Sequence, residues 1–221
     1  VNIINGGAHA NNKLQLQEFM IVPRTGAIED DIRLGAEVFH ALGKILSRHG
    51  YSTTVGDEGG YGPNLSSHEE ALDLICQASE SAGGRLGDNI SLCLDAAASE
   101  FYHDGKYQLI AGKTPIAGEG LISYYQGLIR QYPIISIEDP MAEDDYTGWQ
   151  AITAKLGKEV MLVGDDLFVT NTKLLQQGIE KQLANAVLIK LNQIGSLSET
   201  MDAIKLARKA GYKVIISHRS G

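Results

Sequence analysis

The chain has 221 residues, of which 43% are hydrophobic and 21% are charged; this length fits a single α/β barrel, and these fractions exclude a long disordered or low-complexity chain. Acidic residues outnumber basic residues by 27 to 19, which gives a formal net charge of −8. Because an acidic surface repels phosphate backbones, non-specific nucleic-acid binding is disfavoured, and an anionic substrate would need a local cluster of cations or a metal ion.

Short apolar runs alternate with amphipathic stretches along the chain. The chain opens with two predicted strands, Asn2–Asn5 and Glu18–Val22, and continues with two predicted helices, Asp30–His49 and Ser67–Ala82. Strands and helices then alternate, in the order strand Ile90–Asp95, helix Gly120–Gln131, strand Ile134–Glu138, helix Asp145–Leu156, strand Val160–Gly164, helix Asn171–Lys181, strand Ala186–Lys190, helix Ser196–Ala210 and strand Lys213–Ser217.

Two helix starts carry a recognisable capping pattern. Ser67 is followed three residues later by Glu70, and Ser196 is followed three residues later by Glu199. In a capping box the serine accepts a backbone N–H of the first turn, and the glutamate reaches back to the backbone of the serine. We therefore expect helices to begin at both positions.

The order of elements predicts the fold class. Repeated strand–helix units indicate a parallel sheet, either doubly wound or closed into a barrel, and near-continuous apolar strands indicate burial on both faces. A polar residue lies at or just beyond the C-terminal end of nearly every strand, and in a parallel barrel these ends meet on one face, where barrel enzymes hold their chemistry. We therefore predict an α/β barrel whose candidate site residues are Asn5, His9, Asp95, Glu138, Asp165, Lys190 and His218.

Three of these residues are carboxylates on successive strands. Asp95, Glu138 and Asp165 each end an apolar strand, where an isolated charge is costly to desolvate. A cation between them would offset their repulsion, and oxygen-only ligands favour Mg²⁺ over zinc. The alternative is that each acid caps the following helix or pairs with a base, a role for which Asp139 and Asp166 are the better candidates.

Lys190 ends the most apolar strand. Lost solvation and a nearby metal ion would both favour the neutral amine, so Lys190 is a candidate general base. The alternative is a lysine whose stem packs while its amine reaches water.

Two glycine-flanked segments also carry polar residues. The loop Gly56–Gly60 holds Asp57 and Glu58, and its glycines would let the backbone approach a ligand closely; the alternative is a solvated turn. His9 has a similar glycine flank, and Gln17-Glu18 opens the second strand.

The end of the chain, Ser217–Gly221, gathers His218, Arg219 and Ser220. Together they form a candidate clamp for a phosphate or a carboxylate, with the Arg219 guanidinium as a bidentate donor. The other histidines, which are His40, His49, His68 and His103, fall on predicted helices or loops and are interpreted as structural or solvated. Cys76 and Cys93 are interpreted as buried thiols and Trp149 as a packing residue.

Several of these segments together match the motifs of a known family. Seven motifs, in order along essentially the whole chain, resemble those of the enolase family (phosphopyruvate hydratases). They are Ile4–Ala10, Gln17–Met20, Val55–Gly60 with Pro63-Asn64, Ser136–Pro140, Gly164–Leu167 with Val169–Asn171, Ile189–Gly195 and Ser217–Gly221.

The resemblance implies a ββαα(βα)₆ barrel that follows a smaller α+β domain. Residues 1–221 would then be a partial catalytic C-terminal barrel domain with seven of eight strands. The N-terminal domain with its mobile loop would be absent, as would the last strand–helix unit, which carries a second catalytic lysine in the family. The abrupt strand pattern at both ends also predicts a fragment, which we expect to be inactive alone and prone to aggregate.

The resemblance also implies the reversible dehydration of 2-phospho-D-glycerate to phosphoenolpyruvate with Mg²⁺ as cofactor. Lys190 resembles the base that takes the C2 proton, and Glu58 resembles the acid that protonates the leaving C3 hydroxyl. The base must then be neutral and the acid protonated at neutral pH. Asp95, Glu138 and Asp165 resemble the metal ligands; His9 and Glu18 resemble supporting residues; His9, Gln17, Glu18, His218, Arg219 and Ser220 resemble substrate-binding residues.

Two other functions remain open: another enzyme of the same superfamily that acts on a different carboxylate, and a non-catalytic, surface-displayed enolase that captures a host protein. We expect a small-molecule substrate, a homo-oligomer when the protein is full length, no requirement for nucleic acid, and no membrane span, since no apolar run approaches the roughly 20 residues that a span needs. Two cysteines without a framework and the absence of a signal peptide favour the cytoplasm, although the family also occurs at the surface of bacteria or secreted.

Overall fold

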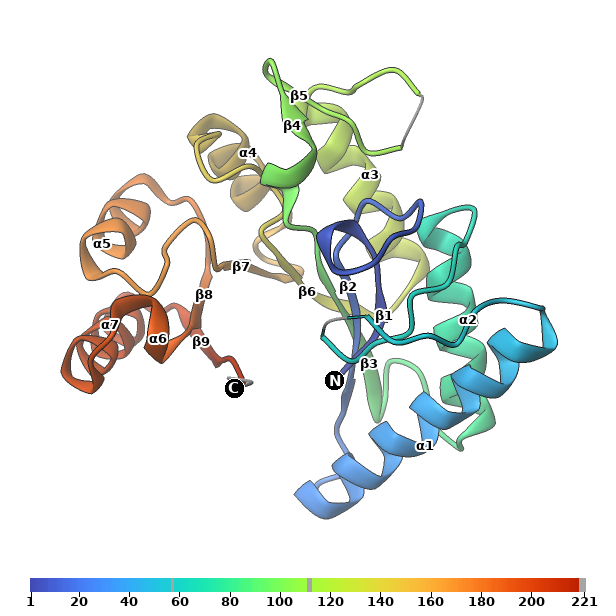
Figure 1. Ribbon diagram of the computed structural model, residues 1–221. Helices are drawn as coiled ribbons and strands as arrows, with labels where there is room; N and C mark the ends of the chain where they lie inside the picture. Colours follow the sequence, from blue (N-terminus) through green and yellow to red (C-terminus); the bar gives the residue numbers. More distant parts are fainter. Residues whose placement is uncertain (57, 111–112, 219–221) are drawn as a thin grey trace. The chain divides into compact units, whose positions relative to one another are not determined.

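The computed structural model describes residues 1–56, 58–110 and 113–218. The chain divides into two compact units, of which unit 1 comprises Val1–Ala96 and His103–Ile135 and unit 2 comprises Ala97–Tyr102 and Ser136–Gly221. Figure 1 labels their helices and strands. Among the described helices, none combines the length and the apolar character that crossing a membrane would require.

The helices and strands follow the predicted order. The strands are β1 (Asn2–Asn5), β2 (Glu18–Pro23), β3 (Ile90–Asp95), β4 (Tyr102–His103), β5 (Lys106–Tyr107), β6 (Ile134–Glu138), β7 (Met161–Gly164), β8 (Ala186–Ile189) and β9 (Lys213–Ile216). The helices are α1 (Ile28–Arg48), α2 (His68–Ser81), α3 (Gly118–Gln131), α4 (Tyr146–Leu156), α5 (Thr172–Lys181), α6 (Leu191–Ile194) and α7 (Leu197–Lys209), with 3₁₀ turns η1 (Gly7–His9) and η2 (Ala98–Phe101). Every predicted strand and helix is present, and the α/β class with the ββαα(βα)n order is confirmed. The β4–β5 hairpin and α6 were not predicted, and His103 lies in β4 rather than in a helix or loop.

The sheet of unit 1 differs from the parallel arrangement that the sequence predicted. β2 pairs antiparallel with both β1 and β3, with Asn5 opposite Glu18 and Glu18 opposite Asp95. A strand that is buried on both faces carries the same apolar pattern whichever way its neighbours run, so the pattern could not reveal this direction. The start of β2 therefore lies beside the ends of β1 and β3, which brings Glu18 to the same edge as the strand-end residues.

Helices α1 and α2 pack against each other in unit 1, where they run side by side (Figure 1). Val38, Leu42 and Leu46 of α1 are completely buried, whereas Ile32 near its start is 65% exposed. Ser67 caps α2 as predicted, because its side chain accepts the Glu70 N–H at 3.1 Å. The Glu70 carboxylate reaches back to the Ser66 N–H at 2.7 Å, one residue further than a capping box predicts.

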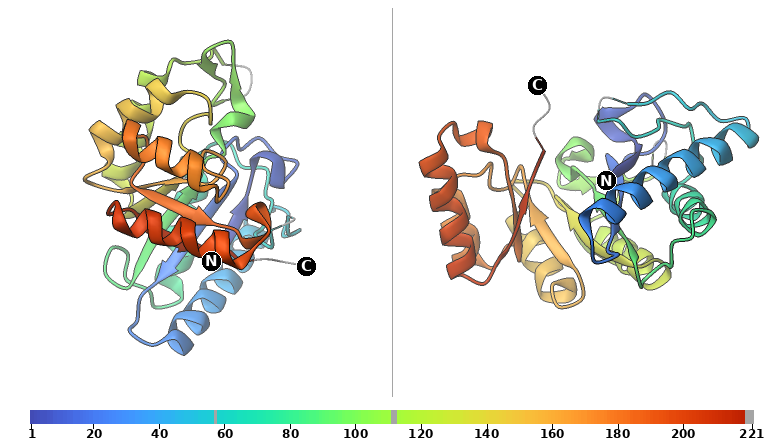
Figure 2. Two further views of the ribbon diagram at one scale, coloured as in Figure 1. Left: turned by 90° about the vertical axis from the view of Figure 1, so that its left-hand side faces the viewer. Right: turned by 90° about the horizontal axis from the view of Figure 1, so that it is seen from below.

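In unit 2 the strands pair as the sequence predicted. β6, β7, β8 and β9 run parallel in that order. Helices α5 and α7 pack together, and α7 also contacts β8 and β9, as Figure 2 shows. Val163 and Leu188 are buried in the core of this unit. Trp149 is fully buried and donates its indole N–H to the Ala142 carbonyl at 3.0 Å, so its predicted packing role is confirmed.

Two predictions of burial are wrong. The sequence predicted that 214–216 would be buried on both faces, but Val214 and Ile215 are half-buried and Ile216 is 72% exposed. Within the described part of unit 2, β8 is the strand that pairs with β9, and the other edge of β9 has no strand against it. Cys93 is buried as predicted, whereas Cys76 is only half-buried.

Candidate active site

The edge of unit 1 gathers four of the predicted site residues. Glu18 lies opposite Asp95 in the β2–β3 register, and both side chains are largely buried. The imidazole Nδ1 of His9 lies 3.2 Å from Glu18 Oε1. Gln17 donates its side-chain N–H to Asp95 Oδ2 at 3.1 Å and its backbone N–H to the Asp95 carbonyl at 2.9 Å. Each of the two acids therefore has its own polar partner from the segment that follows β1.

The glycines of the Gly56–Gly60 loop serve a different contact from the predicted one. A Cβ on Gly56 would lie 2.5 Å from the His9 carbonyl oxygen, and a Cβ on Gly60 would lie 2.6 Å from Asn5 Oδ1. These glycines let the loop approach both β1 and the segment that follows it. Whether they also admit a ligand stays a prediction. Glu58 in this loop is half-buried, and Asp57 lies outside the described residues.

A buried histidine holds the segment that carries Gln17 and Glu18. His68 Nε2 accepts the backbone N–H groups of Gln15 and Leu16 at 3.1 and 3.4 Å. Its Nδ1 therefore carries the ring proton and donates it to the Tyr124 hydroxyl at 2.9 Å. Burial lowers the pKa of His68 from its ordinary value of 6.5 to about 4, so the ring is neutral at pH 7. The predicted structural role of His68 is confirmed.

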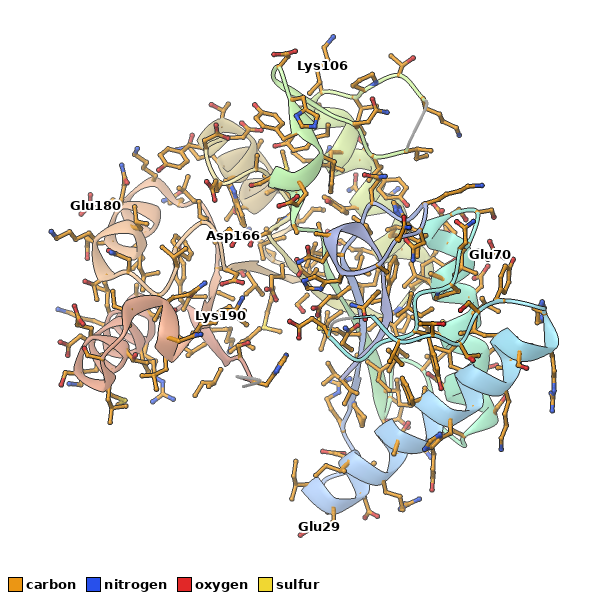
Figure 3. All side chains as sticks on the ribbon, viewed as in Figure 1. Glu29, Glu70, Lys106, Asp166, Glu180 and Lys190 are labelled. Carbon is orange, nitrogen blue, oxygen red and sulfur yellow. The ribbon has the colours of Figure 1, made fainter. Side chains whose placement is uncertain are left out.

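Unit 2 brings Lys190 and Asp165 together. The Lys190 ammonium contacts Asp165 Oδ2, and Gln193 donates its side-chain N–H to Asp165 Oδ1 at 2.9 Å. Lys190 follows β8 and Asp165 follows the neighbouring parallel strand β7, so both residues lie at the same edge of the sheet. Figure 3 labels Lys190 and Asp166, the residue after Asp165. Only 22% of the Lys190 side chain is exposed. The predicted base thus has a buried carboxylate as its polar partner.

The loop after β7 is strained where it meets this pair. Val169 and Thr170 adopt φ values of 40° and 58°, the left-handed region that β-branched residues rarely enter. The Thr170 hydroxyl donates to the side-chain oxygen of Gln193 at 2.9 Å and accepts the Lys190 N–H at 2.9 Å. Thr170 thus connects the backbone of Lys190 to the side chain that binds Asp165.

Asp139 also contacts the Asp165 region. Its two carboxylate oxygens accept the backbone N–H groups of Asp165 and Asp166 at 3.0 and 2.8 Å. Asp139 and Asp166 were the better candidates for capping the helices that follow them. Asp139 instead caps the turn after the neighbouring strand β7. Burial, followed by the charge of Asp165, raises the pKa of Asp166.

The carboxylates of unit 2 fit a hard cation. Oxygen atoms of Asp139, Asp165 and Asp166 lie within 4.8 Å of one another. Glu138 is half-buried at the end of β6, and Asp165 is 5% exposed. A set of carboxylate oxygens without sulfur or nitrogen ligands suits Mg²⁺. The third predicted ligand, Asp95, belongs to unit 1 and ends β3.

The predicted clamp is described only in part. His218 is exposed and its carbonyl accepts the Ser217 hydroxyl at 3.0 Å. Arg219 and Ser220 lie outside the described residues. Sequence reasoning did not single out Thr170 or Gln193, although both belong to motifs that it recognised.

A comparison with known families supports the α/β barrel class of the fold. The model of the family described as "Enolase, C-terminal TIM barrel domain" matches residues 1–221. The chain therefore belongs to this family of enolase C-terminal TIM barrel domains, within the enolase superfamily.

Proposed function

We propose that this protein catalyses the reversible dehydration of 2-phospho-D-glycerate to phosphoenolpyruvate. Membership of the enolase family supports an enzyme of the lyase type. The observation that carries the specific proposal is the contact of Lys190 with Asp165, because it pairs a candidate base with a candidate metal ligand. We also propose that residues 1–221 form part of the catalytic barrel of a longer, homo-oligomeric, cytoplasmic protein.

The proposed reaction uses a base and an acid from this chain. Lys190 Nζ takes the proton from C2 of the substrate, and the electron pair of the broken C–H bond forms the C2–C3 double bond. Glu58 donates a proton to the C3 hydroxyl, whose C–O bond breaks so that water leaves. His9, Gln17 and Glu18 support the acid and the substrate, while His218, Arg219 and Ser220 hold the substrate, the last two at its phosphate.

Asp95, Glu138 and Asp165 are the proposed Mg²⁺ ligands. When bound, Mg²⁺ would offset the negative charge that develops on the substrate carboxylate as the C2 proton leaves. Gln193 orients Asp165 through its hydrogen bond. Lys190 must release its proton to act as the base, and its contact with Asp165 provides a polar partner for the ammonium after proton transfer.

The test is Lys190→Ala in the full-length protein. General bases contribute about 10²–10⁴-fold to rates, so exchange of the C2 proton of 2-phosphoglycerate with solvent, followed by NMR, should fall by at least about 10²-fold. Mg²⁺ binding, measured by calorimetry, should stay nearly intact. Lys205→Ala is the matched control, because the side chain of Lys205 is 71% exposed and forms a surface ion pair with Asp202.

Near-normal C2 exchange in Lys190→Ala would remove Lys190 from the mechanism. If the wild-type protein binds Mg²⁺ but does not exchange the C2 proton of 2-phosphoglycerate, the alternative of a superfamily enzyme with a different carboxylate substrate replaces this proposal. If the wild-type protein neither binds Mg²⁺ nor turns over such substrates, a non-catalytic binding function replaces it.

A further inference from the structure

The structure assigns Asp139 as a positioning residue that fixes the backbone of Asp165 and thereby orients the Asp165 carboxylate for cation binding. This inference rests on the proposed function, because it concerns the same metal site. It differs from that function in naming a residue that neither touches the substrate nor serves as one of the proposed ligands.

Three hydrogen bonds join Asp139 to the end of β7. The Asp139 N–H donates to the Val163 carbonyl at 2.9 Å, which continues the β6–β7 pairing by one residue. The carboxylate then accepts the N–H groups of Asp165 and Asp166. Hydrogen bonds to an ionised acceptor are about twice as strong as neutral ones, so the turn after β7 is held firmly at two consecutive peptide groups.

The conformation of Asp139 directs its side chain to this turn. Asp139 has φ 38°, in the left-handed region that aspartate and asparagine enter more readily than most residues. It is only 4% exposed, and its carbonyl accepts the Ala98 N–H at 3.0 Å. Its side chain is therefore buried, and its backbone is held on both sides.

Asp139 lies between two proposed metal ligands, one next to it in the chain and one in contact with its side chain. Asp139 directly follows Glu138, one proposed ligand, and its carboxylate binds the backbone of Asp165, another. A single residue thus couples the ends of β6 and β7 at the two ligands of unit 2. Both oxygens of Asp139 already accept a backbone N–H, so the geometry favours positioning over direct coordination. Removing such supporting contacts to a metal ligand typically weakens metal binding about 10–100-fold.

The experiment compares Asp139→Asn and Asp139→Gly with Asp145→Asn in the full-length protein. Asparagine keeps the shape and tolerates φ 38° but turns an N–H donor toward one of the two backbone N–H groups; glycine tolerates the backbone and removes the side chain. Asp145 is the matched control, because its carboxylate also accepts a backbone N–H, that of Gly148 at 2.9 Å, at the start of α4.

Two measurements are made on each variant. Hydrogen exchange followed by mass spectrometry reports the peptide that contains residues 164–167, and calorimetry reports Mg²⁺ affinity. We expect both Asp139 variants to exchange faster in this peptide than the wild type and to bind Mg²⁺ at least about 10-fold more weakly. At saturating Mg²⁺ the fold-loss in kcat should be smaller than the fold-loss in Mg²⁺ affinity. Asp145→Asn should match the wild type in both measurements.

If both Asp139 variants exchange hydrogen in this peptide at the wild-type rate, the inference is overturned. Faster exchange with unchanged Mg²⁺ affinity would also overturn it, since Asp139 would then stabilise the fold without positioning a ligand. If Asp139→Asn does not fold, Asp139→Gly decides. A wild-type protein that does not bind Mg²⁺ would contradict the proposed function itself, and the exchange measurement would still report whether Asp139 holds the turn.

Discussion

At the scale of single residues, the candidate site depends on polar side chains that are buried and individually partnered. His68 is the clearest case outside the proposed catalytic set. It accepts two backbone N–H groups from the segment that leads to Gln17 and Glu18, and it donates to Tyr124. A protonated ring could not accept those N–H groups, so the neutral state of His68 is needed to hold that segment.

His68 therefore predicts a loss of stability in mild acid. Its pKa is about 4 in the folded protein and 6.5 ordinarily, so between these values the unfolded chain binds a proton that the folded chain does not. Its contribution to stability is complete above pH 6.5 and is lost as the pH falls toward 4. At pH 5 the expected loss is about 2 kcal/mol, from about 1.4 kcal/mol for each unit of pKa difference.

The measurement is urea unfolding at pH 7.5 and pH 5 for the wild type and for His68→Gln. Glutamine can accept a backbone N–H but does not titrate, so the contributions of all other groups cancel in the comparison. We expect the wild type to lose about 2 kcal/mol more than His68→Gln. Equal losses in the two proteins would show that His68 titrates normally in the folded state.

At the scale of elements, the loop between β7 and α5 combines strain with hydrogen bonding. Val169 and Thr170 are β-branched residues with positive φ, which costs about 1–3 kcal/mol each. The Thr170 hydroxyl offsets part of this cost through its bonds to Gln193 and to the Lys190 N–H. The strained loop is thereby tied to the segment that carries the proposed base.

Thr170→Val should destabilise the protein by about 1–3 kcal/mol, because it leaves the side-chain oxygen of Gln193 and the Lys190 N–H without this partner. Valine is also β-branched, so the backbone strain is matched and the substitution tests the hydroxyl alone. Thr170→Ser keeps the hydroxyl and should lose clearly less. Urea unfolding measures both, and a valine variant as stable as the serine variant would mean that the hydroxyl contributes little.

At the scale of the whole molecule, the described chain contains two compact units with different sheet topologies. Their edge strands are protected unequally. The outer edge of β1 hydrogen-bonds Tyr61, through the Asn5 N–H at 2.8 Å and the Ile3 carbonyl at 3.0 Å, so this edge is partly covered. β9 instead presents Ile216 with 72% of its surface exposed.

Exposed apolar edges associate with other chains, whereas a lysine on an edge strand opposes such pairing. Ile216→Lys should therefore raise the monomeric fraction of the purified 221-residue chain in light scattering coupled to size exclusion. Leu197→Lys is the matched control, because it adds the same charge at a residue that is 68% exposed but begins helix α7 and lies on no strand. An equal improvement in both variants would attribute the effect to net charge rather than to the edge.

The sequence by itself determined where most of the helices and strands lie and which residues are candidates for the chemistry. Strands such as Ile90–Asp95 and the cap Ser67 follow from apolar periodicity and from side chain–backbone contacts a few residues apart, which are local properties of the chain. The polar residues that end these strands were recognisable because a charge beside a buried strand requires a partner.

Only the tertiary structure decided which residues are the partners of these polar strand-end residues. The contacts of Asp165 with Lys190 and Asp139 depend on which strands are neighbours and on their register. These residues are 25 and 26 positions from Asp165, so the local sequence does not indicate the contacts. The same is true of the antiparallel β2, which places Glu18 opposite Asp95. Direction and register are set by packing across the sheet, so they arise only when distant segments meet.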